Sequence, residues 1–372
     1  MKTPRFRLPD GFAVNAGLLL LLIAGLLAAF LPVPEFSEHE RRYLADAPAA
    51  PSLTDWKTDR QVESYLSDRI PLRRWLVGAD AAVHVLTGRR TQLESWPVGD
   101  AFLEKPVAGD AAQVERRLAQ MAEVAEKAGA DFTLITPPTH GYLLRETLPR
   151  PMRSLYEAEG GCYAALAAHE AYLPLEEAFA ASPESVYYRT DHHWTLQGAY
   201  LAYEAYCSRT GLEPLPMEGF RLTGYDGFLG TTYSRSGLPF AVPETLRCAQ
   251  PESLPELTVL DDGSRHQGLI FPEKAATYDG YAVYMGGNYG LAEIINPEAP
   301  EGTLLVYKDS FANCLLPLLS AHYRRIVVMD ARYASGSFSD AIAHAGQVDH
   351  VLFVYSLDSL LNDTVVARKI VR

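Results

Sequence analysis

The 372-residue sequence predicts an α/β fold, in which a parallel β-sheet carries helices on both faces. An apolar N-terminal segment precedes this fold in the chain. Three observations support this prediction. Residues 11–33 carry no charged side chain. Residues 110–137 have the pattern of a helix that leads directly into a buried strand. Residues 302–356 repeat the order strand, helix, strand, helix, strand.

The apolar segment, residues 11–33, follows a tail of ten residues that contains three basic side chains. About 20 apolar residues span a bilayer as a helix, and a basic flank stays on the cytoplasmic side. The segment is therefore predicted to be an uncleaved signal anchor, with Phe12–Leu31 in the membrane, residues 1–10 in the cytoplasm and the main domain outside the cell membrane. A cleavable signal peptide, which has a shorter apolar core, is the alternative.

Charge and cysteine usage exclude some functions. The net charge is −13 and no basic stripe occurs, which argues against a nucleic-acid partner. The cysteines show no CxxC spacing, so no structural metal site is predicted, and neither is another cofactor. Outside the cytoplasm the cysteines could form disulfides, but the sequence does not decide which of them pair. They are Cys162, Cys207, Cys248 and Cys314.

The main domain is predicted to span residues 76–372, after a tether and entry helix in residues 34–75. Asp110 and Gln113 form a capping-box pattern for a helix that Gly129 ends. The apolar side chains of this helix share one face, and the strand DFTLI follows. Residues from about 212 to 296 are rich in Gly, Pro and Tyr, which predicts a loop-rich and β-rich insertion.

Ser310 follows the predicted strand GTLLVY, where the chain turns into a helix. Ligands of open α/β sheets bind at the carboxyl ends of strands, so a serine here is a candidate nucleophile. The free N–H groups at the start of the helix would face an oxyanion. The alternative is that Asp309 or Ser310 only caps the helix.

The segment YRTDHHWTL, residues 188–196, supplies a base and an orienting carboxylate. In an extended chain, side chains at positions i and i+2 point the same way. Asp191 and His193 would then share one side, with His192 on the other, so His193 is the predicted base and Trp194 is predicted to form a wall of the site. The alternative is a turn, with Thr195 as the N-cap of the next helix.

Four further residues are candidates for oxyanion or substrate binding. Gly287 and Asn288 in YMGGN could complete an oxyanion hole or form a plain tight turn. Arg332 follows another predicted strand and could contact substrate or form a structural ion pair. Lys308 could stabilise negative charge beside Ser310 or be solvated.

These blocks resemble the DHHW family, relatives of the SGNH-hydrolase-like proteins that O-acetylate alginate and other exopolysaccharides. The resemblance rests mainly on TDHHWT and KDSFAN, and also on LITPPT, YMGGN and VVMDARY. It implies a flavodoxin-like SGNH fold and a triad of Ser310, His193 and Asp191. The sequence lacks the GDS block and the DxxH spacing of ordinary SGNH enzymes, a departure that bears on Gly287 and Asn288.

The resemblance implies an extracytoplasmic, membrane-anchored O-acetyltransferase that acts on a cell-wall or extracellular polysaccharide through an acetyl-serine intermediate. A polytopic membrane acyltransferase would supply the acetyl group. Two alternatives stay open. One is an esterase, in which water accepts the acyl group, and the other is a non-catalytic polysaccharide-binding or assembly protein.

Overall fold

The computed structural model describes residues 12–28, 31–37, 42–47, 56–70, 72–87, 89, 95–182 and 185–370. The chain divides into two compact units. One comprises residues 1–93 with 234–240, and the other comprises residues 94–233 with 241–372. The predicted basic tail, residues 1–10, lies outside the described residues.

In its described residues, the N-terminal unit contains two short strands and two longer helices besides its first helix. Asp68 accepts hydrogen bonds from the guanidinium of Arg42 and the backbone N–H of Ala45, which ties the second helix to the preceding segment. The elements are α1 (Phe12–Ala28), β1 (Phe36–Ser37), β2 (Arg42–Tyr43), α2 (Trp56–Asp68) and α3 (Arg73–Leu86).

Helix α1 contains 17 residues and begins and ends within the predicted anchor. Among the described residues, no helix has both the length and the apolar content needed to span a membrane. The predicted transmembrane helix therefore has no support from the described part of the chain.

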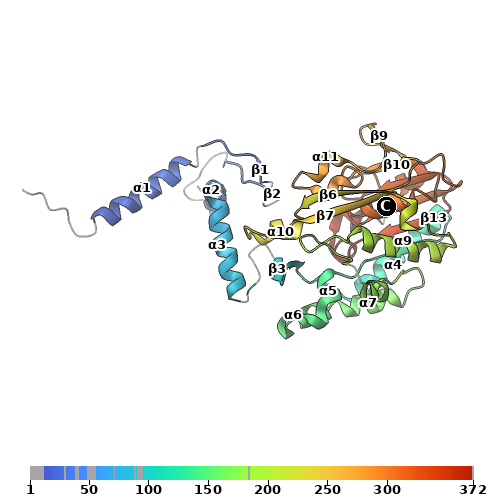
Figure 1. The fold of residues 1–372 in the computed structure, drawn as a ribbon, viewed down its shortest axis with the longest axis horizontal. Helices are drawn as coiled ribbons and strands as arrows, with labels where there is room; N and C mark the ends of the chain where they lie inside the picture. The colour runs from blue at the N-terminus through green and yellow to red at the C-terminus, as the bar shows by residue number, and fades with distance from the viewer. Residues whose placement is uncertain are drawn as a thin grey trace, which may run out of the picture. The chain divides into compact units, whose positions relative to one another are not determined.

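The larger unit is built on a seven-stranded sheet (Figure 1). Its first four strands are parallel, which confirms the predicted parallel sheet. The strand order is β5 (Phe132–Ile135), β13 (His350–Val354), β11 (Thr303–Lys308), β12 (Arg325–Met329), β10 (Leu291–Ile295), β8 (Glu256–Val259) and β9 (Arg265–Gln267).

The predicted insertion is only partly separate from this sheet. Strands β8, β9 and β10 extend the sheet with antiparallel pairing, because β10 pairs with the outer edge of β12. Strands β6 (Arg221–Phe228) and β7 (Glu244–Gln250) form a hairpin of their own. The mixed central sheet therefore includes three strands from residues 212–296, beside the separate hairpin.

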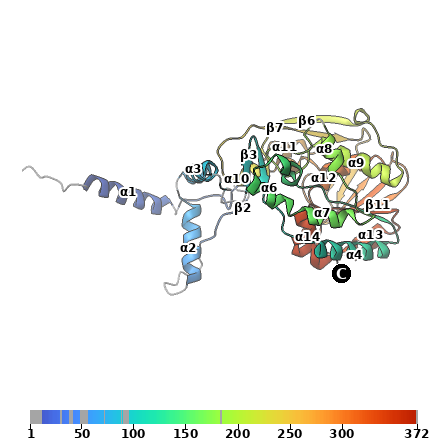
Figure 2. The same ribbon diagram turned by 90° about the horizontal axis from the view of Figure 1, so that it is seen from below.

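Alternate residues of the central strands face two different cores. Leu304, Val306 and Val354 face α9 (Leu196–Thr210) and α12 (Ala312–Leu319). On the other face, Leu305 and Tyr307 pack against the helices that Figure 2 shows together below the sheet. These are α4 (Ala111–Ala128), α7 (Gly160–Ala167), α13 (Phe338–Ala345) and α14 (Leu357–Asn362). Helices on both faces are thus confirmed.

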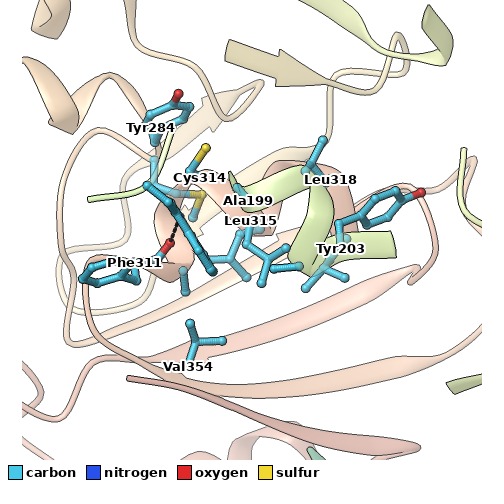
Figure 3. Close-up of a cluster of buried hydrophobic side chains, with 14 of the residues drawn as sticks. Ala199, Tyr203, Tyr284, Phe311, Cys314, Leu315, Leu318 and Val354 are labelled. Carbon is cyan, nitrogen blue, oxygen red and sulfur yellow. Dashed lines mark hydrogen bonds between the residues drawn. The ribbon is translucent and has the colours of Figure 1, made fainter. Parts of the chain in front are cut away.

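Figure 3 shows the core on the α12 face, where Cys314, Leu315 and Leu318 lie against Ala199 and Tyr203 of α9. Every residue of α12 is buried, which fixes the helix that follows Ser310. All four cysteines are buried and free, so none of them forms a disulfide.

The capping signals behave as the sequence predicts. Asp110 accepts from Gln113 N, Gln113 accepts from Asp110 N, and Gly129 ends α4 in the left-handed conformation. Thr195 caps α9. The remaining elements are β3 (Ser95–Val98), β4 (Ala101–Glu104), α5 (His140–Leu144), α6 (Arg150–Glu157), α8 (Glu176–Ala181), α10 (Thr231–Ser236), α11 (Pro272–Ala275) and α15 (Thr364–Lys369).

Candidate active site

Ser310 stands at the carboxyl end of β11, as its place in the sequence predicts. Asp309 anchors the turn, because its carboxylate accepts from Phe311 N at 3.0 Å and from Ser356 N at 2.7 Å. The second bond joins the turn to the end of the neighbouring strand β13. Ser310 does not cap α12, since its hydroxyl bonds elsewhere, and its side chain stays partly exposed.

The hydroxyl of Ser310 meets the histidine that the sequence selects. His193 Nε2 lies 2.7 Å from Ser310 Oγ, and His193 Nδ1 lies 2.6 Å from Asp191 Oδ1. A carboxylate accepts only, so Nδ1 carries the proton and Nε2 can accept the serine proton. The three side chains therefore have the geometry of a Ser-His-Asp triad.

Asp191 is fully buried and held from three directions. Its Oδ1 also accepts from His193 N at 2.9 Å, and its Oδ2 accepts from Thr231 N at 2.6 Å. A Cβ on Gly230 would lie 2.2 Å from the Cβ of Asp191, so only glycine leaves room for this carboxylate. Gly230 and Thr231 lie about 40 positions from Asp191 in the chain, so no local sequence pattern points to them.

The local geometry around the two histidines differs from the prediction. Residues 188–193 form a loop rather than extended chain, closed by an isolated bridge between Tyr187 and Trp194. The ring of His192 therefore lies 3.9 Å from that of His193, not on the opposite side. Its Nδ1 is 3.4 Å from Asp191 Oδ1. The alternation argument selects the histidine that contacts Ser310, but for a reason that does not apply to this loop.

Asp191, His192 and His193 also offer ligand atoms within 4.8 Å of one another, a cluster that could hold a metal ion. Both ring nitrogens of His193 already contact triad partners, so a metal at this ring would break one of these contacts. The cluster fits acid–base chemistry better than metal ligation.

His193 is packed between aromatic rings. Tyr281 stacks on it with 3.8 Å between centroids and 4° between planes, and Phe311 lies at 5.0 Å. Tyr281 escaped sequence analysis, since one tyrosine among 21 carries no local motif. The stacked ring of Tyr281 and the tilted ring of Phe311 together restrict the imidazole plane, whose Nε2 must point at Ser310.

Trp194 does not form an open wall of the site, which corrects the prediction. Its side chain is fully buried, and Nε1 donates to the carbonyl oxygen of Phe311 at 3.0 Å (Figure 3 shows Phe311). Trp194 thereby joins the loop that carries the base to the turn that carries the nucleophile. Its apolar ring packs in the core, and its one polar atom, Nε1, bonds to the protein backbone.

Lys308 is buried, in contrast to the solvated alternative. Its ammonium donates to Asn288 Oδ1 and to Asn313 Oδ1, each at 2.8 Å, and lies 3.5 Å from Asp330 Oδ2. Burial lowers the pKa of Lys308 to about 8, although Asp330 opposes the shift. Asn313 was missed by sequence analysis.

Arg332 forms the ion pair that was one of its two predicted roles. It contacts the Asp330 carboxylate in a bidentate pair, at 2.9 Å and 2.7 Å. Burial by itself would raise the pKa of Asp330, but Lys308 and Arg332 lower it below its usual value. Asp330 therefore stays ionised between two cations.

The predicted oxyanion residues lie in a turn with unusual backbone. Gly286 and Gly287 have φ of 76° and 127°, a region that favours glycine. Gly287 N donates to Tyr284 O at 3.4 Å, and Gly287 O accepts from Asn313 Nδ2 at 3.3 Å. Asn288 Oδ1 accepts from Lys308, two residues before Ser310, and from Asn313, three residues after it.

A cavity of about 1000 Å³ lies under the β6–β7 hairpin, separate from Ser310. Its wall includes Glu244, whose carboxylate accepts from Arg189 N, Thr190 N and the Thr190 hydroxyl. The hairpin therefore holds the segment that leads into Asp191.

Two family models match the chain. The model of the DHHW protein family covers residues 172–329, and that of the SGNH hydrolase-like domain, acetyltransferase AlgX, covers residues 98–221. The predicted resemblance to the DHHW family is confirmed. Both matches contain Asp191 and His193, and the DHHW match also contains Ser310 and Asn288.

Solved structures agree with this resemblance at the level of the fold. A DHHW family protein from Eubacterium siraeum is 22% identical with a TM-score of 0.61, over 73% of this chain and 93% of that one. PatB1 from Bacillus cereus, determined with a sulfonyl adduct, is 22% identical with a TM-score of 0.60, over 73% and 97%. No curated protein sequence matches the chain.

Proposed function

We propose that this protein is a serine-dependent O-acetyltransferase that modifies a polysaccharide. The observation that carries the proposal is the continuous hydrogen-bonded line from Asp191 through His193 to Ser310. The match to a family model named for an acetyltransferase supports the same reaction class. The triad alone would serve an esterase equally well, because the two enzymes differ only in the group that accepts the acyl chain.

In the proposed reaction, His193 Nε2 takes the proton of Ser310 as Oγ attacks the acetyl carbonyl. Asp191 stabilises the imidazolium through Nδ1. The leaving group departs with the proton from His193, and Ser310 is left acetylated. A sugar hydroxyl then gives its proton to His193 and attacks the acetyl-serine, which transfers the acetyl group and restores Ser310.

Two N–H groups are available for the oxyanion of the tetrahedral intermediate. Within residues 95–182 and 185–370, neither Ser310 N–H nor Asn288 Nδ2 makes a hydrogen bond. The Oδ1 atom of Asn288 accepts from Lys308 and Asn313, so the amide orientation leaves Nδ2 as the available donor. Such donors stabilise the oxyanion because they are already oriented.

The proposal also includes the place of reaction and the donor. We propose that residues 11–33 hold the protein at the cell membrane, with the catalytic domain on the extracytoplasmic side and a polytopic membrane acyltransferase as acetyl source. Membrane fractionation and protease accessibility of the larger unit in intact cells test this part separately. Recovery of the full-length chain in the washed soluble fraction would contradict anchoring.

The reaction itself is tested with the full-length chain, p-nitrophenyl acetate and candidate glycans. We expect an acetyl group on Ser310 and then on sugar, detected by mass spectrometry. Ser310→Ala should lower turnover by about 10³-fold or more. Ser253→Ala, in the turn between β7 and β8, is the matched control.

The outcomes separate the candidate functions. Acetylated glycan supports the transferase, and release of acetate alone, with every glycan unmodified, supports the esterase. Because a structure of PatB1 holds a sulfonyl adduct, labelling of Ser310 by an aryl sulfonyl fluoride is an independent check on its nucleophilicity. Wild-type turnover by Ser310→Ala would reject the triad, and an absence of turnover by the wild type would favour a non-catalytic role.

A further inference from the structure

The buried ammonium of Lys308 lies at the centre of a cluster of side chains directly beside the nucleophile. Lys308 ends β11, two residues before Ser310, and only 3% of its surface is exposed. Its three close partners are Asn288, Asn313 and Asp330. A buried charge of this kind is costly unless every partner is oriented toward it, so the cluster requires an explanation.

Lys308 fixes the orientation of two amides at once. An ammonium donates only, so the groups that face it must be the carbonyl oxygens of Asn288 and Asn313. Each amide nitrogen therefore points away from Lys308. Asn313 uses its nitrogen inside the cluster, on Asn288 Oδ1 at 3.1 Å and Gly287 O at 3.3 Å. The Nδ2 of Asn288 is the donor that the cluster leaves available.

The acidic partner offsets part of the positive charge in this arrangement. Asp330 is fully buried between Lys308 and Arg332. Because Arg332 already pairs with both oxygens of Asp330, the carboxylate is held in place and does not displace the weaker amide acceptors from Lys308. The ammonium can thus donate to two neutral carbonyls, an unusual use for a buried lysine.

We infer that Lys308 is a positioning residue that holds Asn288, through its Oδ1 atom, in the one amide orientation that presents Nδ2 to the oxyanion formed at Ser310. The inference rests on the proposed acyl-transfer function and adds to it the residue that orients the oxyanion donor. Lys308 acts through Asn288 and does not touch the substrate. Asn313 supports the same orientation from the first turn of α12.

A double-mutant cycle tests this inference, with p-nitrophenyl acetate as the substrate of the full-length chain. Asn288→Ala should lower kcat on the order of 10²-fold, the effect of losing one oxyanion donor. Lys308→Met should lower kcat at least about 10-fold with KM nearly unchanged. In the Asn288→Ala background, Lys308→Met should have little further effect, because the group it positions is gone.

The pH profile provides a second readout, which loss of folding alone would not change in the same way. Lys308 faces Asp330, Arg332 and Asp309, and its pKa is lowered to about 8 by burial. The wild type should therefore lose kcat as pH rises above about 8, since the charged donor becomes a neutral amine. Lys308→Met should lack this alkaline decline. Lys127→Met, an exposed helical lysine, should behave as the wild type.

The outcomes distinguish this inference from the proposed function. If Ser310→Ala keeps wild-type activity, the proposed function fails. If Ser310→Ala is inactive but the effects of Lys308→Met and Asn288→Ala multiply fully, the inference fails and the function stands. Should Lys308→Met not fold, Asn313→Ala removes a second bond to Asn288 Oδ1 and must show the same loss of effect in the Asn288→Ala background.

Discussion

The two halves of the candidate triad are held in different ways. Ser310 is placed by the core of the fold, at the end of β11, with β12 and β13 on either side and a fully buried helix behind it. Asp191 and His193 lie on a loop, where individual hydrogen bonds and glycines set their positions. The nucleophile should therefore tolerate few changes in packing, whereas the base half should be sensitive to single polar contacts.

The largest effect on the base half is expected from Asp191→Asn. An amide beside Nδ1 favours the tautomer that carries the proton on Nε2, so His193 no longer accepts the serine proton. We expect kcat to fall by roughly 10³–10⁴-fold while the thermal midpoint changes little. Steady-state kinetics with circular dichroism checks this, and a loss below tenfold would contradict the role of Asp191.

Gly230→Ala tests whether space around Asp191 matters as much as its charge. The added Cβ would overlap Asp191, so the carboxylate must move and its bond to His193 must lengthen. We expect kcat to fall by about 10²-fold, in line with small misplacements of catalytic groups. Gly161→Ala is the control, because its Cβ would meet nothing within 4 Å. Equal activities of the two variants would show that the loop absorbs the change.

Glu244→Ala tests the support that the β6–β7 hairpin gives to the base loop. It removes the acceptor of three hydrogen bonds from Arg189 and Thr190, just before Asp191. We expect a smaller loss, about tenfold in kcat, together with faster amide hydrogen exchange in residues 188–193. Unchanged exchange would show that Asp191 is held by its direct contacts alone.

A prediction on the other face of the sheet concerns stability rather than activity. Burial raises the pKa of Glu159 to about 7, although bonds from Thr139 and Val107 N oppose the shift. The folded state binds this proton more tightly than the unfolded state, so stability falls as pH rises from about 4.5 to 7. The loss is about 3 kcal/mol at most. Glu159→Gln should flatten this dependence in thermal melts, and an identical slope would refute it.

The sequence predicts those parts of the site that depend on chain-local patterns. Ser310 was selected by its place after a strand, and the cap residues of α4 and α9 by their spacing. These features are fixed within a few residues of each other. The parallel strands were equally visible, since both of their faces are buried and apolar.

The remaining features depend on contacts between distant segments. Three contacts of the site join positions that are 20 or more residues apart in the chain. They are Gly230 against Asp191, Tyr281 on His193 and Asn288 on Lys308. The antiparallel pairing of β10 with β12 also depends on distant segments. The alternating sequence of β10 fits a strand in a separate sheet equally well, so it does not predict this pairing. Lys308 was the hardest to predict, since a lysine usually stays at the surface unless a specific cage is built around it.

The strand order also constrains when the site can assemble. Strand β13 lies between β5 and β11, so the parallel sheet cannot close around Ser310 before residue 354 has emerged from the ribosome. The Asp309 bond to Ser356 depends on the same late segment. Pairing between such distant segments slows folding, because a long loop must close before the contacts that stabilise it can form. In a nascent chain, Ser310 is therefore held apart from the local pair of Asp191 and His193, and catalytic competence arises only in the last stage of folding.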